Sequence, residues 1–187
     1  MSGLSLFGTE SLGVLCALVG LGALVGLGER LRAEGVPGAT TRRIVHAGVS
    51  LFVAATPVLF GRPLPVYVLA ATFTAANAIA RSRHWWAGIH AARPESWGTV
   101  ALPLSVLVAL GMTWAIAPDR LFAFQGAYLV LALADPAASW VGERSTRSPA
   151  DAWNATASGS LTFAGLAFGL SVLVLGGGTS WGPEAVF

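Results

Sequence analysis

The chain has no lysine, a single cysteine and few charged residues, and each shortage excludes a class of protein. Charged residues make up 11% of the sequence, well below the roughly 25% of a soluble domain, whereas 55% of the residues are hydrophobic. This balance excludes a soluble globular protein and indicates an integral membrane protein. Because Cys16 is alone, the chain can form neither an internal disulfide nor a cysteine-based metal site.

Several familiar sequence signals are also missing. No strand pattern precedes the glycines of residues 20–28, and no Gly-Lys-Ser/Thr follows them, so they indicate close helix packing and not a nucleotide loop. The N-terminus lacks the positive region of a signal peptide, so we expect the first apolar stretch to remain as a helix. Without a fixed-period repeat or a low-complexity linker, residues 1–187 are expected to form a single membrane domain.

Six stretches approach or reach the roughly 18 to 20 apolar residues that cross a bilayer. They lie at about 11–28, 44–61, 64–80, 99–117, 121–141 and 158–176. We therefore expect an all-α, polytopic integral membrane protein with about six transmembrane helices.

The arginines predict how these helices are oriented, because cytoplasmic loops collect positive charge. Nine of the 11 arginines fall after the first, third and fifth stretches, whereas the opposite loops hold only Arg62 and Arg120. Six helices with both chain termini on the outer side satisfy the rule at every loop. We expect the protein to lie in the cell (inner) membrane. The net charge of +2 is then mostly this pattern, and we expect no nucleic-acid partner.

Asp135 is the only acidic residue within the long apolar stretches. A carboxylate at mid-span costs about 2.5 to 3.5 kcal/mol on insertion scales, so its presence indicates a site. Pro136 follows it and is expected to push Asp135 away from helical geometry and to free backbone oxygens beside the carboxylate. Oxygen ligands of this kind suit a hard cation such as Mg²⁺.

Polar residues gather at the cytoplasmic starts of three predicted helices. Helix N-termini present unpaired N–H groups and a positive dipole end, so these starts are candidate phosphate sites. The alternatives are that the arginines anchor the topology, that the serines and threonine cap helices, and that the histidine only bonds a neighbouring helix. The residues are Arg42, Arg43, His46, Ser96, Gly98, Thr99, Gly159 and Ser160.

Four segments, taken in order, resemble the polyprenol kinase family of dolichol kinase, phytol kinase and CTP-dependent diacylglycerol kinase, which is distantly similar to phosphatidate cytidylyltransferases. They begin at Arg42, Glu95, Ala132 and Gly159, and the third ends at Gly142. The resemblance implies transfer of the γ-phosphate of CTP to the hydroxyl of a membrane lipid alcohol at the cytoplasmic face, with Mg²⁺. It also adds Gly142 to the residues expected to bind the nucleotide.

Phosphoryl transfer also assigns roles to the polar residues already singled out. It requires a metal ligand, positive charge around the phosphates and a group that positions the acceptor hydroxyl. Asp135, the pair Arg42 and Arg43, and His46 would supply these in turn. We expect the lipid to enter laterally between helices, membrane lipids to surround the protein, and a homodimer to be among its assemblies.

The sequence departs from the family in two places. The lysine and acid usual before the Gly159–Ser160 pair are absent, and the 187 residues do not include the family's further helix with an Asp-Asn pair. Either the sequence is short or that last element is absent. Arg144 and Arg147 could compensate for the missing lysine, and Glu143 is a substitute for the acid. The departures leave two alternatives open: a catalytically silent member that binds a lipid or a partner protein, and a phosphatidate cytidylyltransferase-like enzyme.

Overall fold

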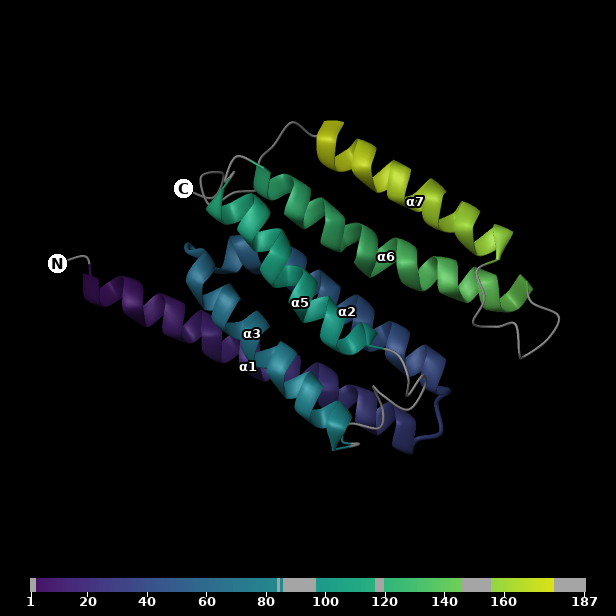
Figure 1. The fold of residues 1–187 in the computed structure, drawn as a ribbon, viewed down its shortest axis with the longest axis horizontal. Coiled ribbons are helices and arrows are strands. Elements are labelled where there is room, and N and C mark those ends of the chain that lie inside the picture. The colour runs from purple at the N-terminus through teal and green to yellow at the C-terminus, as the bar shows by residue number, and fades with distance from the viewer. Residues whose placement is uncertain (1–2, 84, 86–96, 117–119, 146–155, 177–187) are drawn as a thin grey trace.

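The computed structural model describes residues 3–83, 85, 97–116, 120–145 and 156–176, and within these ranges the protein is all-α. Figure 1 shows its helices as a bundle. They are α1 (Gly3–Ala33), α2 (Gly38–Leu59), α3 (Pro63–Ser82), α5 (Gly98–Leu110) with a π-helical turn η1 (Gly111–Ala115), α6 (Leu121–Ser145) and α7 (Ala157–Gly176).

The predicted all-α membrane class is confirmed, since four helices are long and apolar enough to cross a membrane. These are Ser11–Ala33 within α1, and α3, α6 and α7. Among the other described helices, α2 carries Arg42 and Arg43 near its start, and Gly98–Trp114 is a shorter apolar helix.

Several helices are longer than the apolar stretches that predicted them. α1 continues through Glu29 and Arg30 to Ala33, and α6 continues through Glu143 and Arg144 to Ser145. Charged residues of this kind are good helix formers. Hydropathy therefore predicted the apolar part of each helix and not its ends.

The expected departure from helical geometry at Asp135 is wrong. α6 runs without interruption from Leu121 to Ser145 and contains Pro136. Proline lacks only its own N–H, so a helix whose faces are packed can continue through it with one backbone bond missing. The missing bond is the one to the carbonyl of Ala132, a buried residue. Asp135 is therefore presented by a regular helix.

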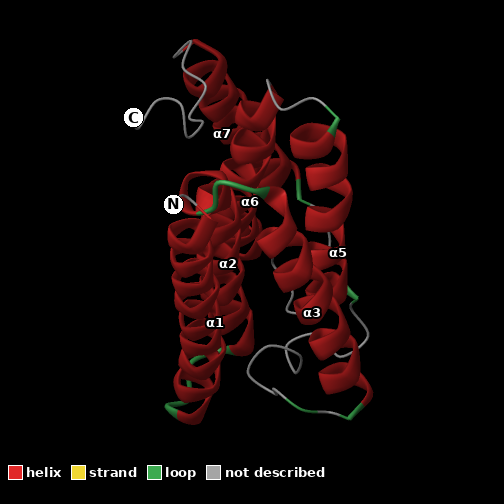
Figure 2. Cartoon of the chain, turned by 90° about the vertical axis from the view of Figure 1, so that its left-hand side faces the viewer, coloured by secondary structure: helices red, strands yellow, loops and turns green. Residues whose placement is uncertain are grey.

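The helices pack as neighbouring pairs. α1 lies against α2, α3 against α5, and α6 against both α2 and α7. Figure 2 shows α1 and α2 on one side of the molecule and α3 and α5 on the other. α2 and α3 are consecutive and are joined at residues 60–62, so the two pairs are tied covalently at one end.

A hydrophobic core lies at this tied end. Phe60, Leu110 and Phe124 are almost completely buried, and the Phe124 and Tyr128 rings pack with their centroids 4.8 Å apart. The Tyr128 hydroxyl lies 3.0 Å from the Ser105 hydroxyl, which joins α6 to α5. The core therefore holds α2, α3, α5 and α6 together at one end of the bundle.

α7 is the outermost helix. In Figure 1 it lies beyond α6, at the edge opposite α1. Gly159 is its only buried residue, whereas the large side chains Leu161, Phe168 and Leu173 are more than 70% exposed. An apolar helix exposed to this extent is suited to contact with lipid chains and not with water.

Candidate functional site

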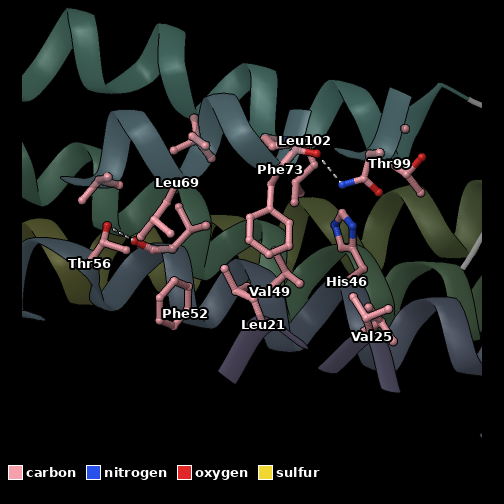
Figure 3. Close-up of a pocket in the computed structure, with 18 of the residues that line it drawn as sticks. Leu21, Val25, His46, Val49, Phe52, Thr56, Leu69, Phe73, Thr99 and Leu102 are labelled. Atoms are coloured by element: carbon pink, nitrogen blue, oxygen red, sulfur yellow. Dashed lines mark hydrogen bonds between the residues drawn. The ribbon is translucent and has the colours of Figure 1, made fainter. Parts of the chain in front are cut away.

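A cavity of about 150 Å³ lies between the two helix pairs. Its wall is built mainly from apolar side chains of α1, α2, α3 and α5. Figure 3 shows how these side chains line it. They include Leu21, Val25, Val49, Phe52, Leu69, Phe73, Leu102 and Val106.

The cavity is polar at one end only. Arg42 and His46 of α2, Asn77 of α3, and Gly98 and Thr99 of α5 all lie at that end. Figure 3 shows His46 and Thr99 together, far from Thr56 at the opposite end. An amphiphile whose polar head lies at the first end and whose hydrocarbon chain lies along the rest would match this distribution.

The other end of the cavity is closed by buried residues. Thr56, Val66 and Val106 line it and are at most 3% exposed. The Thr56 hydroxyl donates to the carbonyl of Val53 at 2.7 Å, so it offers no free donor to a ligand. The α2–α3 connection and the hydrophobic core lie next to this end.

His46 belongs both to the cavity and to the interface between α2 and α6. Its ring lines the cavity, while its Nε2 atom lies 3.7 Å from Oδ2 of Asp135. That distance is too long for a hydrogen bond. His46 is 26% exposed and Asp135 53%, so the carboxylate can reach water or a ligand. The structure therefore brings together the two residues for which the sequence predicted chemistry.

Arg43 is directed away from the cavity. Its Nε donates to the Ser139 hydroxyl at 3.0 Å, and its guanidinium forms an ion pair with Glu143, so both partners lie on α6. The Arg43 side chain is 13% exposed and Glu143 28%. The two arginines that were expected to act together therefore diverge: Arg42 lines the cavity and Arg43 joins two helices.

Helix geometry explains this divergence. Neighbouring residues on an α-helix lie about 100° apart, whereas residues four apart lie about 40° apart. Arg42 and His46 therefore share a face, and Arg43 lies on the next one. His46 falls between the two directions, which lets it line the cavity and also face α6. This periodicity was present in the sequence and could have separated the two arginines.

The interface between α2 and α6 carries further polar groups toward the core. Gln125 of α6 donates from Nε2 to the carbonyl of Ala54 at 3.3 Å. Within the described part of the chain, the Gln125 Oε1 and the Ser50 hydroxyl are buried without a hydrogen-bond partner. The sequence analysis singled out only charged residues within the apolar stretches, so it missed Gln125, Ser50 and Asn77. The amide side chains of Gln125 and Asn77 within those stretches could have indicated them.

Two of the predicted phosphate-binding residues, Gly98 and Thr99, begin α5 at the polar end of the cavity. The α5 start has no side-chain cap at Trp97, which precedes it. Ser96, which was predicted to act with them, lies outside the described residues. The start of α5 is therefore a predicted helix N-terminus that adjoins the cavity.

The start of α7 has a different arrangement. Thr156 caps it, because its hydroxyl accepts a hydrogen bond from the N–H of Gly159 at 3.1 Å. A Cβ at Gly159 would lie 2.9 Å from the Ala138 carbonyl oxygen, and one at Gly142 would lie 2.9 Å from the Thr156 hydroxyl. Close packing of α6 against α7 thus accounts for both glycines without a ligand. Ser160 is exposed.

Arg144 lies near the end of α6, above the ring of Trp140, with 3.6 Å between its guanidinium carbon and the ring centroid. Both side chains are exposed, so the contact is a surface cation–π pair. Arg147, the other residue expected to compensate for the missing lysine, lies outside the described residues. The compensation by these two arginines stays a prediction.

The residues around Asp135 fit a magnesium ion only in part. Mg²⁺ bound with a nucleotide needs one or two carboxylates, with water and phosphate oxygens completing the octahedron. Asp135 offers one accessible carboxylate, whereas Glu143 is paired with Arg43. Among the described residues, no group of three or more His, Cys, Asp or Glu side chains gathers in one place. Asp135 is therefore the accessible carboxylate that these residues offer to a metal.

Comparison of the chain with models of known protein families, with curated proteins and with solved structures finds no match.

Proposed function

We propose that this protein is a membrane kinase that transfers the γ-phosphoryl group of CTP to the hydroxyl of a lipid alcohol. The observation that carries the proposal is the position of His46, which lines an apolar cavity and also faces the carboxylate of Asp135. An apolar chain in the cavity would place its head group beside this pair. The resemblance to polyprenol kinases supplies the nucleotide and the direction of transfer.

His46 and Asp135 can together prepare the acceptor hydroxyl. Closing the 3.7 Å gap between Nε2 of His46 and Oδ2 of Asp135 when substrate binds would let the carboxylate hold the proton on Nε2. The lone pair of the neutral ring would then remain on Nδ1 and could accept the hydroxyl proton. The hydroxyl oxygen then forms a bond to the γ-phosphorus, and the bond from that phosphorus to the β,γ-bridging oxygen breaks. CDP leaves, and the proton remains on His46 until water takes it.

The positive charge at the polar end of the cavity serves the phosphates. Arg42 lies there with the first turn of α5, whose N–H groups and dipole favour an anion. A magnesium ion held in part by Asp135 would supply charge neutralisation between the β- and γ-phosphates. Arg43, which is paired with Glu143, maintains the position of α2 against α6 and does not contact the nucleotide.

The proposal includes the topology predicted from the arginines. The chain crosses the inner membrane six times, with both termini outside and the polar end of the cavity at the cytoplasmic face. Support comes from the position of Arg42 and His46 at the polar end of the cavity, in the first half of α2, which follows the end of α1 that carries Arg30 and Arg32. CTP and Mg²⁺ would then reach the site from the cytoplasm.

The test uses purified protein in lipid nanodiscs with CTP labelled at the γ-phosphate, Mg²⁺ and a panel of farnesol, phytol, dolichol and diacylglycerol. We expect at least one alcohol to become labelled. His46→Ala and Asp135→Asn should each lower the rate by about 10²- to 10⁴-fold, the range for general acid–base groups. Glu34→Gln is the matched control. It removes one carboxylate charge, as Asp135→Asn does, but from an exposed pair with Arg30 near the end of α1.

A second function remains a candidate because of the charges around Asp135. Glu143 is paired with Arg43, so a carboxylate that could have joined Asp135 is engaged in packing. A protein of this kind would bind the lipid or a partner without catalysis. Lipid binding without transfer would support this function, and so would Asp135→Asn leaving both nucleotide binding and thermal stability unchanged. Transfer of a cytidylyl group to phosphatidate would instead release diphosphate, which the same assay detects.

A further inference from the structure

The pair of helices α3 and α5, here called the arm, is attached to the rest of the protein at one end. α2 joins α3 through residues 60–62, and α5 leads through η1 to α6. Both connections lie at the end of the bundle that holds the hydrophobic core, where the hydroxyls of Ser105 and Tyr128 also join α5 to α6. Figure 2 shows the arm beside α1 and α2. Its other end borders the polar part of the cavity.

The arm is built as one unit. α3 and α5 pack against each other. At the end beside the cavity, the guanidinium carbon of Arg81 lies 4.6 Å from the centroid of the Trp97 ring. This cation–π pair joins the last turn of α3 to the residue before α5. The two helices are therefore held together at both ends, and a movement of one must carry the other.

The helices across the cavity, α1, α2 and α6, are here called the base, and they are also tied to one another. Arg43 of α2 bonds Ser139 and pairs with Glu143, both on α6. Leu24 of α1 packs so closely on Gly48 of α2 that a Cβ there would lie 2.7 Å from its Cδ2 atom. The cavity separates this base from the arm at the polar end. Its width there can change through the angle at the attached end alone.

Two features at the attached end suit a hinge. Gly61 lies in the connection between α2 and α3 with open space around it, so its backbone angles can change without a clash. At the other connection, α5 ends in the π-helical turn η1, a local departure from regular helical bonding. Ile79 lies 18 residues beyond Gly61, about 27 Å along a helix. A hinge rotation of about 10° would therefore move Ile79 by about 5 Å.

The outer face of the arm permits such a rotation. Apolar side chains on this face are exposed, and in a membrane they would meet lipid chains, which are fluid and equally apolar. A helix pair bordered by lipid can change its angle without separating from another helix on that side. The side chains are Leu64, Val68, Ile79, Leu104 and Val108, between 49% and 68% exposed.

Arginines stand on both sides of the polar end. Arg42 of the base lines the cavity. Arg81 of the arm lies one turn beyond the lining residue Asn77, on the same helix face. Trp97, on which Arg81 stacks, directly precedes the lining residue Gly98. Arg81 is therefore at the mouth of the cavity. Like charges on the arm and the base repel each other, and an anion between them would attract both.

We propose that the arm closes on a ligand that carries a phosphate group, and that Arg81 is the contact from the arm. A guanidinium stacked on a ring still donates through its edge, where its N–H groups lie, and this edge matches phosphate oxygens. Closure would also keep water away from the phosphoryl group during transfer. The closing movement rests on the proposed function only for the identity of the nucleotide. A soluble polyphosphate and a lipid phosphate monoester share the chemistry that Arg81 recognises.

Closure can be measured as a distance between spin labels. Cys16 is exposed and is first replaced by Cys16→Ser. Labels are then attached at Ile44→Cys on the base and Ile79→Cys on the arm, two exposed positions. Full-length protein in phosphatidylcholine nanodiscs is studied by double electron–electron resonance with tripolyphosphate, with CTP and Mg²⁺, or with cytidine, at matched ionic strength. We expect the first two to shorten the distance by about 5 Å and cytidine to leave it unchanged. A pair within the arm, Ile79→Cys with Leu104→Cys, should not change.

Substitutions identify the side chains that drive closure. Arg81→Gln and Arg42→Gln should each abolish the response to tripolyphosphate and weaken CTP binding by about tenfold or more, because each removes a charged hydrogen-bond donor. Arg83→Gln is the matched control: it removes the same charge from the same end of α3 but from a different helix face, and the response should remain. If Arg81→Gln does not fold, Trp97→Leu decides, since it removes the ring that holds the guanidinium. An unchanged distance in the unsubstituted protein, or full closure in Arg81→Gln or Trp97→Leu, contradicts the proposal.

Nanodiscs that contain phosphatidic acid distinguish the two sources of phosphate. Closure in these nanodiscs without added anion assigns the phosphate to a lipid, whereas closure by tripolyphosphate in phosphatidylcholine alone assigns it to a soluble ligand. Each result supports a phosphate-closed arm. Closure by CTP without labelled product would support the arm and contradict the kinase. Labelled product with an unchanged distance would support the kinase and contradict the arm.

Discussion

Replacing Glu143 by glutamine removes one partner of the ion pair that joins α2 to α6. The Arg43 side chain is only 13% exposed and its partner 28%, so the arginine would keep its charge with little access to water. Breaking a fully buried pair costs about 3 to 5 kcal/mol, and an exposed pair is worth about 0 to 1 kcal/mol. This pair lies between these cases, and we expect Glu143→Gln to cost about 2 kcal/mol, or about 30-fold in the unfolding equilibrium.

A double-mutant cycle isolates the interaction. Arg43→Gln should cost about 1 kcal/mol, because the remaining carboxylate can reach water, and the double variant should cost no more than that, because neither charge is then left unpaired. The coupling energy is therefore expected to be about 2 kcal/mol. Tryptophan fluorescence can follow reversible unfolding in mixed detergent micelles. The exposed Arg30–Glu34 pair is the control, with an expected coupling below about 0.5 kcal/mol.

The same cycle decides what Arg43 does. If the single substitutions add to give the double, within about 0.5 kcal/mol, the pair does not stabilise the interface and Arg43 is available to a ligand. If the double variant keeps its nucleotide affinity while Arg42→Ala loses it, the separation of the two arginines into a cavity residue and a packing residue is correct.

Two further predictions concern the family-like segments at the end of α6 and the start of α7. Gly159→Ala should destabilise the protein by about 1 to 3 kcal/mol, because its methyl group would lie 2.9 Å from the Ala138 carbonyl oxygen, whereas Gly165→Ala on the same helix has open space and should leave the unfolding midpoint unchanged or raise it. Changing Arg144 and Arg147 together to alanine should abolish CTP binding, measured by equilibrium dialysis, if they replace the missing lysine; unchanged affinity would contradict that role.

The sequence predicted the helical membrane class because apolar stretches of sufficient length have few alternatives in a bilayer. It also assigned His46 and Asp135 to one reaction, and the structure places Nε2 of His46 3.7 Å from Oδ2 of Asp135. It did not predict that α6 would stay helical through Pro136. Proline weakens a helix locally, and packing of α6 against two neighbours outweighs one missing hydrogen bond.

The direction of each side chain was harder to predict. Arg42 and Arg43 were treated as one unit, although adjacent residues cannot share a helix face. The cavity could not be predicted at all, because its wall depends on how two helix pairs diverge, and no local pattern in Val49, Leu69 or Val106 specifies that angle. Packing between distant segments determines it.

The cavity also makes the surrounding bilayer a participant in recognition. An unfilled apolar cavity weakens a protein by about 24 cal/mol per Å³, so 150 Å³ corresponds to roughly 3 to 4 kcal/mol of lost packing. In a membrane, the acyl tails of bulk lipids are always present to fill it. Any acceptor must then displace a lipid tail, and its apparent affinity will change with the acyl composition of the host membrane. Stripping the protein of lipid during purification should lower its stability before it removes any substrate.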